Sequence, residues 1–146
     1  MDVIRKLGEL ALGTRLKRLS DRLMQDVSRV YRDHAVPFRA RWFAVLFALR
    51  ERSPQAISEL AGNLGLTHTA INQIAAEMSL EGLLISRRDP HDERRRLLSL
   101  SAKGEEAVVA LEPIWKGIWA ATSEVLEEAD HDVLGAIAAV ERVLDE

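Results

Sequence analysis

The stretch from Ile57 to Leu100 constrains the fold more than any other part of the chain. Its first half holds a small residue, Ala61, and a glycine, Gly65, among apolar residues at helical spacing: Leu60, Leu64, Leu66, Ile71 and Ile74. Two helices that cross closely tolerate only a small side chain at their contact. The turn between them favours a residue that can adopt positive φ. The spacing therefore predicts a helix-turn-helix.

The second half of this stretch predicts a β-hairpin with a basic turn. Leu83–Arg88 and Arg95–Ser101 have strand character, and the segment between them contains proline and aspartate, which favour turns. Five arginines fall within ten residues: Arg87, Arg88, Arg94, Arg95 and Arg96. A helix for the major groove and a basic hairpin for the minor groove suit one DNA duplex. The alternative for the arginine run is an ordinary solvated surface.

Thr67 is placed to cap the second helix of the motif, which we expect to end before Gly82. One face of this helix carries polar, mostly uncharged groups, namely His68, Thr69, Asn72 and Gln73. Such groups suit hydrogen bonds with base edges, and Asn72 and Gln73 are candidates for paired contacts with adenine. The alternative is that these side chains only coat an exposed helix.

The net charge of −3 hides an uneven distribution along the chain. Residues 1–104 carry 18 Lys and Arg against 12 Asp and Glu, whereas residues 105–146 carry 2 against 11. Attraction to phosphate depends on local charge density rather than on the total. The distribution is therefore compatible with nucleic-acid binding.

The rest of the chain is predicted to be helical, in a single domain of 146 residues. We expect helices over about 2–32, with a kink near Gly8 and Gly13, and over about 38–50, 102–127 and 130–144. Ser53-Pro54 predicts the start of the helix-turn-helix, since serine caps helices and proline suits a first helical position.

Several classes of protein are excluded by what the sequence lacks. It has no cysteine, which excludes disulfides and thiolate metal sites. The N-terminal residues form no uninterrupted apolar run, so we expect neither a signal peptide nor a membrane span, and the cytoplasm is the default location. No two histidines lie at ligand spacing, so we expect no metal and no cofactor.

Across essentially its whole length the chain resembles the MarR (multiple antibiotic resistance regulator) family of winged helix-turn-helix proteins. The most specific part, residues 89–104, is similar to the family's wing signature: an aspartate, paired arginines, an apolar strand, Leu-Thr and Lys-Gly. Asp92 and Arg94 fall on the aspartate and the second arginine. Glu93 stands in place of the first arginine and Ser101 in place of the threonine. The first departure puts one wing contact in doubt, for which Arg95 and Arg96 are the substitutes.

The resemblance implies a mainly α fold with a small β-hairpin wing. A winged helix-turn-helix over about 38–101 would be flanked by dimerisation helices over about 1–35 and 102–146. We expect Asp92 to orient Arg94 across the turn through a charge-assisted hydrogen bond. The expected DNA-binding residues are Thr67, His68, Thr69, Asn72, Gln73, Arg88, Arg94, Arg95 and Arg96.

The resemblance further implies an obligate homodimer, in which the terminal helices interleave and the DNA site is pseudo-palindromic. The apolar stripes of the terminal helices are compatible with this, and an intramolecular bundle is the alternative. Members of the family often couple DNA affinity to a small-molecule effector. Arg39, Trp42 and Phe43 are candidates for lining its pocket, the alternative being that they are ordinary core residues.

We weigh three functions. A sequence-specific regulator of transcription that binds double-stranded DNA accounts for the helix-turn-helix and the arginines together. A winged-helix module for protein interaction has no need of five arginines beside a polar helix. An enzyme is disfavoured, because no catalytic spacing and no phosphate-cradling glycine loop is present. The sequence is also compatible with one module of a longer fusion.

Overall fold

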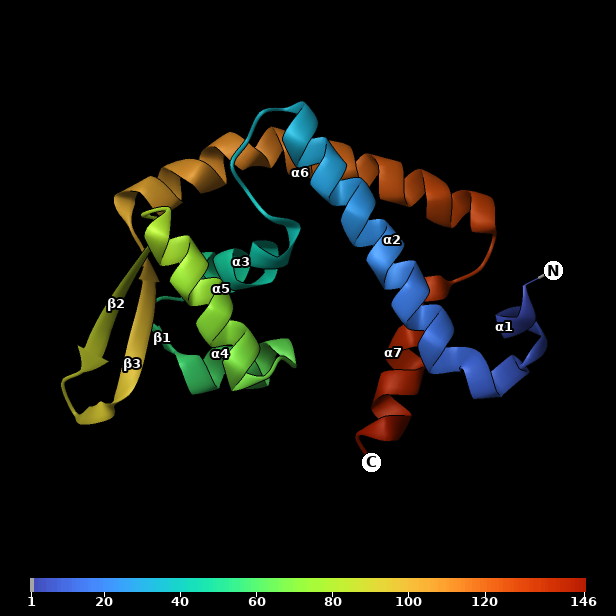
Figure 1. The fold of residues 1–146 in the computed structure, drawn as a ribbon, viewed down its shortest axis with the longest axis horizontal. Helices are drawn as coiled ribbons and strands as arrows, with labels where there is room; N and C mark the ends of the chain where they lie inside the picture. Colours follow the sequence, from blue (N-terminus) through green and yellow to red (C-terminus); the bar gives the residue numbers. More distant parts are fainter. Residues whose placement is uncertain (1) are drawn as a thin grey trace. The chain divides into compact units, whose positions relative to one another are not determined.

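Residues 2–146 are described by a computed structural model (Figure 1), and Met1, the first position of the predicted domain, lies outside them. The prediction of a mainly α fold with a β wing is confirmed. The elements are α1 (Val3–Lys6), η1 (Gly8–Ala11), α2 (Leu12–Asp33), η2 (Ala40–Trp42), α3 (Phe43–Glu51), β1 (Gln55–Ala56), α4 (Ile57–Leu64), α5 (His68–Leu80), β2 (Leu84–Asp89), β3 (Asp92–Leu100), α6 (Ala102–Ala129) and α7 (Val133–Leu144).

The chain divides into two compact units, one ending at Ala110 and the other running from Leu111 to Glu146. The first unit holds α1 to β3 and the first turns of α6, and therefore contains the helix-turn-helix and the wing. The second unit holds the rest of α6 and all of α7. No helix of the described residues is long and apolar enough to cross a membrane.

The N-terminal helix is broken where the sequence predicts a kink. Gly8 has φ +55°, and the chain passes there from α1 into η1 before α2 begins. Gly13 lies inside α2 and does not interrupt it. At the other end of α2, the amide of Val36 donates to the carbonyl of Tyr31 at 3.1 Å, and Ala35 adopts φ +52°. This closing pattern uses a left-handed residue to turn the chain out of the helix.

The core of the first unit lies where η2, α3, α4 and α5 meet. Three aromatic rings lead into it, because Phe38 packs edge-on against both Tyr31 (5.0 Å between centroids) and Trp42 (5.7 Å). Offset and edge-on ring pairs are the favoured geometries for such contacts. The helices contribute fully buried aliphatic side chains, namely Val45, Leu46, Leu49, Leu60, Ile71 and Met78.

The prediction that Ser53-Pro54 starts the helix-turn-helix is wrong. Gln55 and Ala56 form the short strand β1 instead, and α4 begins at Ile57 without a side-chain cap. The hydroxyl of Ser53 donates to the carbonyl of Leu49 at 2.5 Å, so it serves the end of α3. Pairing with β3, more than forty residues away, overrides the local start signal.

The three strands form an antiparallel sheet in the order β1-β3-β2. Gln55 lies opposite Leu98 and Ala56 opposite Leu97. Strands β2 and β3 pair in one register from Leu84–Leu100 to Arg88–Arg96, and a register shift separates these pairs from Asp89–Asp92. The sequence predicted the β2–β3 hairpin but not β1. It placed the start of the hairpin turn at Asp89, whereas β2 continues through Asp89. Figure 1 shows this hairpin beside α4 and α5.

The second unit is helical and rich in exposed apolar side chains. Asp132 caps α7 by accepting a hydrogen bond from the amide of Gly135 at 3.0 Å. Trp119 on α6 is 75% exposed and Leu144 on α7 is 79% exposed. Large apolar groups left open to this extent are typical of helices that bury their faces against another surface.

Candidate nucleic-acid interface

Helix α5 presents a polar face to solvent because its apolar residues point into the core. Ile71 and Met78 are fully buried, whereas Asn72 and Gln73 between them are exposed. The helix starts as predicted, with the hydroxyl oxygen of Thr67 accepting from the amide of Ala70 at 3.0 Å. Thr67, His68 and Thr69 are exposed at this N-terminal end. The structure therefore brings the five polar residues predicted on this helix onto one accessible surface.

The turn before α5 is set by Gly65 and Ala61. Gly65 adopts φ +63°, a left-handed conformation that costs a glycine little. The amide of Leu66 then donates to the carbonyl of Ala61 at 3.0 Å, which closes α4. The small side chain of Ala61 is buried at the contact of the two helices. The turn thus fixes the direction in which α5 leaves the core.

Two aspartates shape the wing turn. The carboxylate of Asp89 accepts from the amide of His91 at 2.8 Å, and that of Asp92 accepts from the amide of Arg94 at 3.0 Å. The sequence predicted that Asp92 would hold the side chain of Arg94. The structure instead gives the bond to the backbone, because an aspartate readily reaches the amide two residues ahead. Asp92 therefore orients Arg94 through the main chain.

The arginines of the wing differ in what they contact. Arg87, Arg88 and Arg94 are exposed, and within residues 2–146 no ion pair engages their guanidinium groups. The guanidinium of Arg96 donates to the hydroxyl of Ser86 on the neighbouring strand at 3.1 Å. Arg95 is half-buried and forms ion pairs with two carboxylates. Only some of the arginines are therefore available for a ligand.

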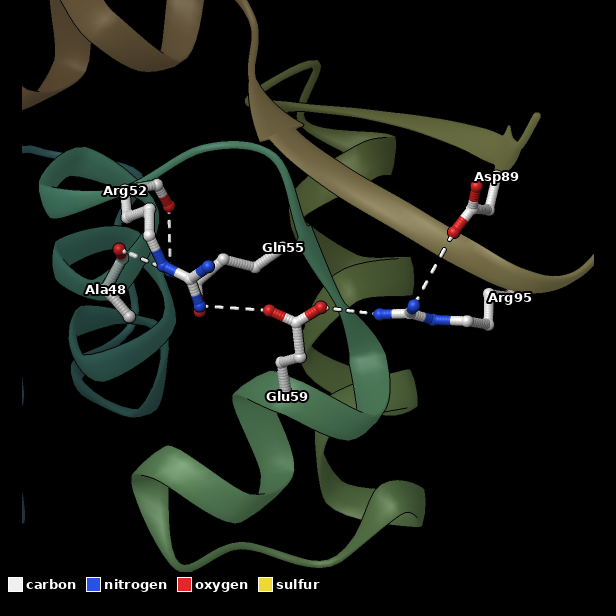
Figure 2. Close-up of polar contacts among 6 residues, drawn as sticks. All are labelled: Ala48, Arg52, Gln55, Glu59, Asp89 and Arg95. Carbon is white, nitrogen blue, oxygen red and sulfur yellow. Dashed lines mark hydrogen bonds and ion pairs between the residues drawn. The ribbon is translucent and has the colours of Figure 1, made fainter. Parts of the chain in front are cut away.

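Arg95 belongs to a chain of charged side chains that runs from α3 to the wing (Figure 2). One oxygen of Glu59 accepts from Arg95 at 2.5 Å and the other from Arg52 at 2.9 Å. Arg95 also lies 3.6 Å from Asp89. The hydrogen bond from Arg52 is the main cause that lowers the pKa of Glu59, and burial opposes it.

Gln55 stabilises the region around Arg52 and Glu59 through hydrogen bonds to the end of α3. Its side chain is 3% exposed, and its amide donates to the carbonyls of Ala48 at 2.8 Å and Arg52 at 2.7 Å. The end of α3, strand β1 and the first turn of α4 are therefore tied together (Figure 2). Sequence reasoning missed Gln55 and Glu59. Glu59 is recognisable only as an acid in the first turn of a helix, and its partner Arg95 is 36 residues away.

Of the three residues predicted to line an effector pocket, Trp42 is buried, whereas Arg39 and Phe43 are exposed. Trp42 is 3% exposed, and its indole N–H donates to a carboxylate oxygen of Glu77 at 2.7 Å. This bond is the main cause that lowers the pKa of Glu77, which also pairs with Arg41. The guanidinium of Arg39 lies 5.8 Å from the centre of the Trp42 ring. Phe43 is exposed and packs against Phe47 with their centroids 5.6 Å apart.

Two cavities of the first unit lie elsewhere. A groove of about 770 Å³ runs along α1, η1 and α2 and is lined by arginines and leucines, among them Arg15, Leu16, Arg18 and Leu19. A cleft of about 320 Å³ lies where Leu49, Leu100 and Val108 meet. Neither is lined by Arg39, Trp42 or Phe43. Within residues 2–146, no group of three His, Asp or Glu side chains is placed to hold a metal ion.

Solved structures of several transcriptional regulators are similar to this chain in fold. The chain superposes on the repressor CouR bound to a 23-mer DNA duplex with a TM-score of 0.74, at 24% identity over 93% of this chain and 96% of that one. It superposes on MosR of M. tuberculosis in complex with DNA with a TM-score of 0.73, at 22% identity over 90% and 97%. These similarities show the fold.

A third solved structure concerns a regulator that responds to a ligand. BpsR of Bordetella bronchiseptica, whose DNA binding is regulated by 6-hydroxynicotinic acid, matches with a TM-score of 0.70, at 20% identity over 92% of this chain and 91% of that one. No curated protein matches the chain closely in sequence.

Residues 37–95 match the model of the MarR family. The matched segment contains the entire helix-turn-helix, strand β2, the wing turn and the start of β3. These are the elements that present the polar face of α5 and the arginines. The sequence match over residues 37–95 and the shared fold show that the chain is similar to the MarR family of winged-helix regulators.

Proposed function

We propose that the protein is a homodimeric regulator of transcription that reads a specific DNA sequence. The observation that carries this is the exposed polar face of α5, next to a wing whose free arginines lie at its turn. We assign DNA binding to residues of about 38–101 and dimerisation to the helices of about 1–35 and 102–146. The chain would act where DNA is, in the cytoplasm.

Helix α5 would enter the major groove with its N-terminal half. Asn72 and Gln73 carry amides that can both donate to and accept from adenine, which no single hydroxyl can do. Thr67, His68 and Thr69 lie at the end of the helix, where backbone N–H groups and the helix dipole favour contact with phosphate. The first pair would supply specificity and the other three would fix the register on the duplex.

The wing would follow the backbone into the minor groove. Arg94 stands at the turn with its guanidinium free of ion pairs, and Asp92 fixes the main chain beside it. A narrow A·T-rich minor groove carries an enhanced negative potential that attracts such an arginine. Arg88 and Arg96 are adjacent cross-strand neighbours and would contact phosphates. Arg95 is left out of this set because two carboxylates already engage it.

A second copy of the chain would cover the apolar faces of the terminal helices. Leu12, Leu16, Leu19 and Leu23 recur along one face of α2, and each is about half exposed. Exposed apolar side chains also follow α7, among them Leu134, Val140 and Leu144. A two-fold dimer would present two copies of α5, and the site would be a pseudo-palindrome with half-sites about one helical turn apart.

A small-molecule effector is part of the proposal, supported by the ligand-regulated BpsR among the similar structures. Arg39 and Phe43 are both exposed to solvent. Trp42 would take part only if its bond to Glu77 opened.

Selection of bound fragments from a random DNA pool tests the proposed function. We expect enrichment of one pseudo-palindromic sequence by the full chain. Binding to all duplexes alike, lost as salt rises, would contradict sequence-specific regulation and favour a winged-helix module with another partner.

A further inference from the structure

We propose that Glu59 is a positioning residue that fixes the wing against the helix-turn-helix through Arg95, and that Arg95 serves this contact rather than the DNA. The four side chains Arg52, Glu59, Arg95 and Asp89 are called here the Glu59 clamp. The inference rests on the proposed function for its binding readout, while a second readout needs no DNA.

The clamp joins three elements that are distant in sequence. Arg52 is the residue that ends α3, Glu59 lies in the first turn of α4, and Arg95 lies on β3. Each oxygen of the Glu59 carboxylate takes one arginine, at 2.9 Å and 2.5 Å, and Arg95 reaches on to Asp89 at the end of β2 (Figure 2). Two positive and two negative charges therefore compensate one another inside the first unit.

The position of Arg95 on β3 explains why the wing needs this tie. Strand β1 pairs only with Leu97 and Leu98, so nearer the turn the wing is a two-stranded ribbon. Such a ribbon is marginally stable alone. Next to Arg95, the pairing of β2 with β3 is interrupted by a register shift between Arg88 and Asp89. The bond from Arg95 to Glu59 therefore extends the anchoring of the wing by two residues toward Arg94.

The engagement of Arg95 argues against a direct role in DNA binding. To contact a phosphate it would have to leave both Glu59 and Asp89, and both carboxylates would then be left without that partner. Arg94, its neighbour, is exposed, and within residues 2–146 no ion pair engages its guanidinium group. The two adjacent arginines therefore divide the work, one holding the wing and the other contacting the groove.

The Glu59 clamp predicts that removing the charge of Glu59 changes DNA affinity in the direction opposite to the one expected from net charge alone. Removing an acidic group from a protein that binds phosphate raises its local positive charge, and this alone tightens binding. If Glu59 holds the wing, its removal weakens binding in spite of the gained charge. Glu93 offers a matched control, because it is an exposed acid on the wing and no ion pair joins it to the described residues.

The first experiment measures the affinity of the full chain for its selected duplex across a series of salt concentrations. We expect Glu59→Gln and Arg95→Gln each to weaken binding about five- to tenfold, since charge-assisted hydrogen bonds are lost. The double variant should be no weaker than either single one. Glu93→Gln should bind as tightly as the wild type or more tightly. The salt slope of Arg95→Gln should match that of the wild type, because no phosphate contact is removed.

The second experiment follows amide hydrogen exchange of the DNA-free protein over residues 86–97. Glu59→Gln should speed exchange in this segment and leave α3 unchanged, whereas Glu93→Gln should change neither. Glu59→Asp keeps the charge on a shorter side chain, so its exchange rate over this segment should lie between those of Glu59→Gln and Glu93→Gln. It replaces Glu59→Gln if that protein does not fold.

Three outcomes would overturn the clamp. They are tighter binding by Glu59→Gln, a flatter salt slope for Arg95→Gln, and unchanged exchange over residues 86–97 in Glu59→Gln or, if that protein does not fold, in Glu59→Asp. Failure of the wild type to select any DNA sequence would instead contradict the proposed function, and the exchange experiment would still decide whether the clamp exists.

Discussion

Asn72 and Gln73 are exposed neighbours on α5, and within residues 2–146 no hydrogen bond engages their side chains. Asn72→Ala or Gln73→Ala should cost about 1–3 kcal/mol of binding on the preferred site, because a paired contact with a base is lost. Titration of labelled specific and random duplexes measures the two affinities. The random duplex should bind almost as before.

Asn63→Ala is the matched control for these variants, since Asn63 is an exposed asparagine on α4. It should leave both affinities unchanged. Equal losses on specific and random DNA for the α5 variants would show that the amides contact the backbone rather than the bases.

Arg94 is the wing residue that we expect to contribute most to binding. Arg94→Ala should weaken binding more on sites with A·T flanks than with G·C flanks, because a narrow groove attracts the arginine. The salt slope should flatten by roughly one to two units, as a dimer loses two cationic contacts. Asp92→Ala should produce a milder defect of the same kind, since it frees the main chain at Arg94.

Arg32→Ala removes an exposed arginine from α2 and serves as the control for the wing variant. Its salt slope should equal that of the wild type. If Arg94→Ala bound with normal affinity and a normal salt slope, other wing residues and not Arg94 would contact the minor groove. Tighter binding by Asp92→Ala would show that Asp92 acts only as a repelling charge.

At the scale of elements, the close approach of α6 to the end of the helix-turn-helix depends on Gly104. A Cβ at this position would overlap the carbonyl oxygen of Leu83, which itself accepts from the amide of Ser101 at 3.0 Å. Gly104→Ala should lower the free energy of unfolding by about 1–3 kcal/mol, because backbone must move. Denaturant unfolding followed by circular dichroism measures this.

Gly62 provides the opposite case in α4, where an added Cβ would meet nothing within 4 Å. Gly62→Ala should raise the free energy of unfolding by about 0.5–1 kcal/mol, because alanine favours the helix. If both substitutions had the same sign, the contact at Leu83 would not be the reason for glycine at position 104.

The elements differ in how far the sequence could predict them. Helix α5 was predicted within a residue at its start, because its cap, Thr67, and its apolar period are both local. Strand β1 was missed since only its pairing with Leu97 and Leu98 makes it a strand. The same limit hid the role of Arg95, which looks in sequence like one more wing arginine. Contacts across 36 residues leave no periodic signal.

At the scale of the whole molecule, the acid dependence of stability should follow two glutamates. Arginine and tryptophan partners lower the pKa of Glu59 and Glu77 from the ordinary value of 4.5. Each group therefore stabilises the folded state fully above that value, and the contribution is lost as the pH falls through the lowered pKa. Thermal melting should be sensitive to Glu59→Gln/Glu77→Gln at pH 7 and progressively less sensitive as the pH falls below 4.5. A larger difference at pH 3 would contradict this assignment.

The terminal helices should decide the oligomeric state. Deleting residues 131–146 removes α7 with its exposed apolar side chains, and the uncovered surface should give monomers or aggregates. Sedimentation equilibrium measures the mass. A truncated protein that remains a dimer with unchanged melting would show that the helices fold back on their own chain.

Strand β1 consists of only two residues, yet it closes a loop. Its pairing with β3 joins Gln55 to Leu98, and every residue of α4, α5 and β2 lies on the chain between them. Closing a loop of this length costs chain entropy, and the pairing of β1 with β3 helps to offset that cost. A fragment cut at the limits of the two motif helices lacks that closure. We therefore expect the smallest fragment that folds on its own to extend from before Gln55 to beyond Leu98.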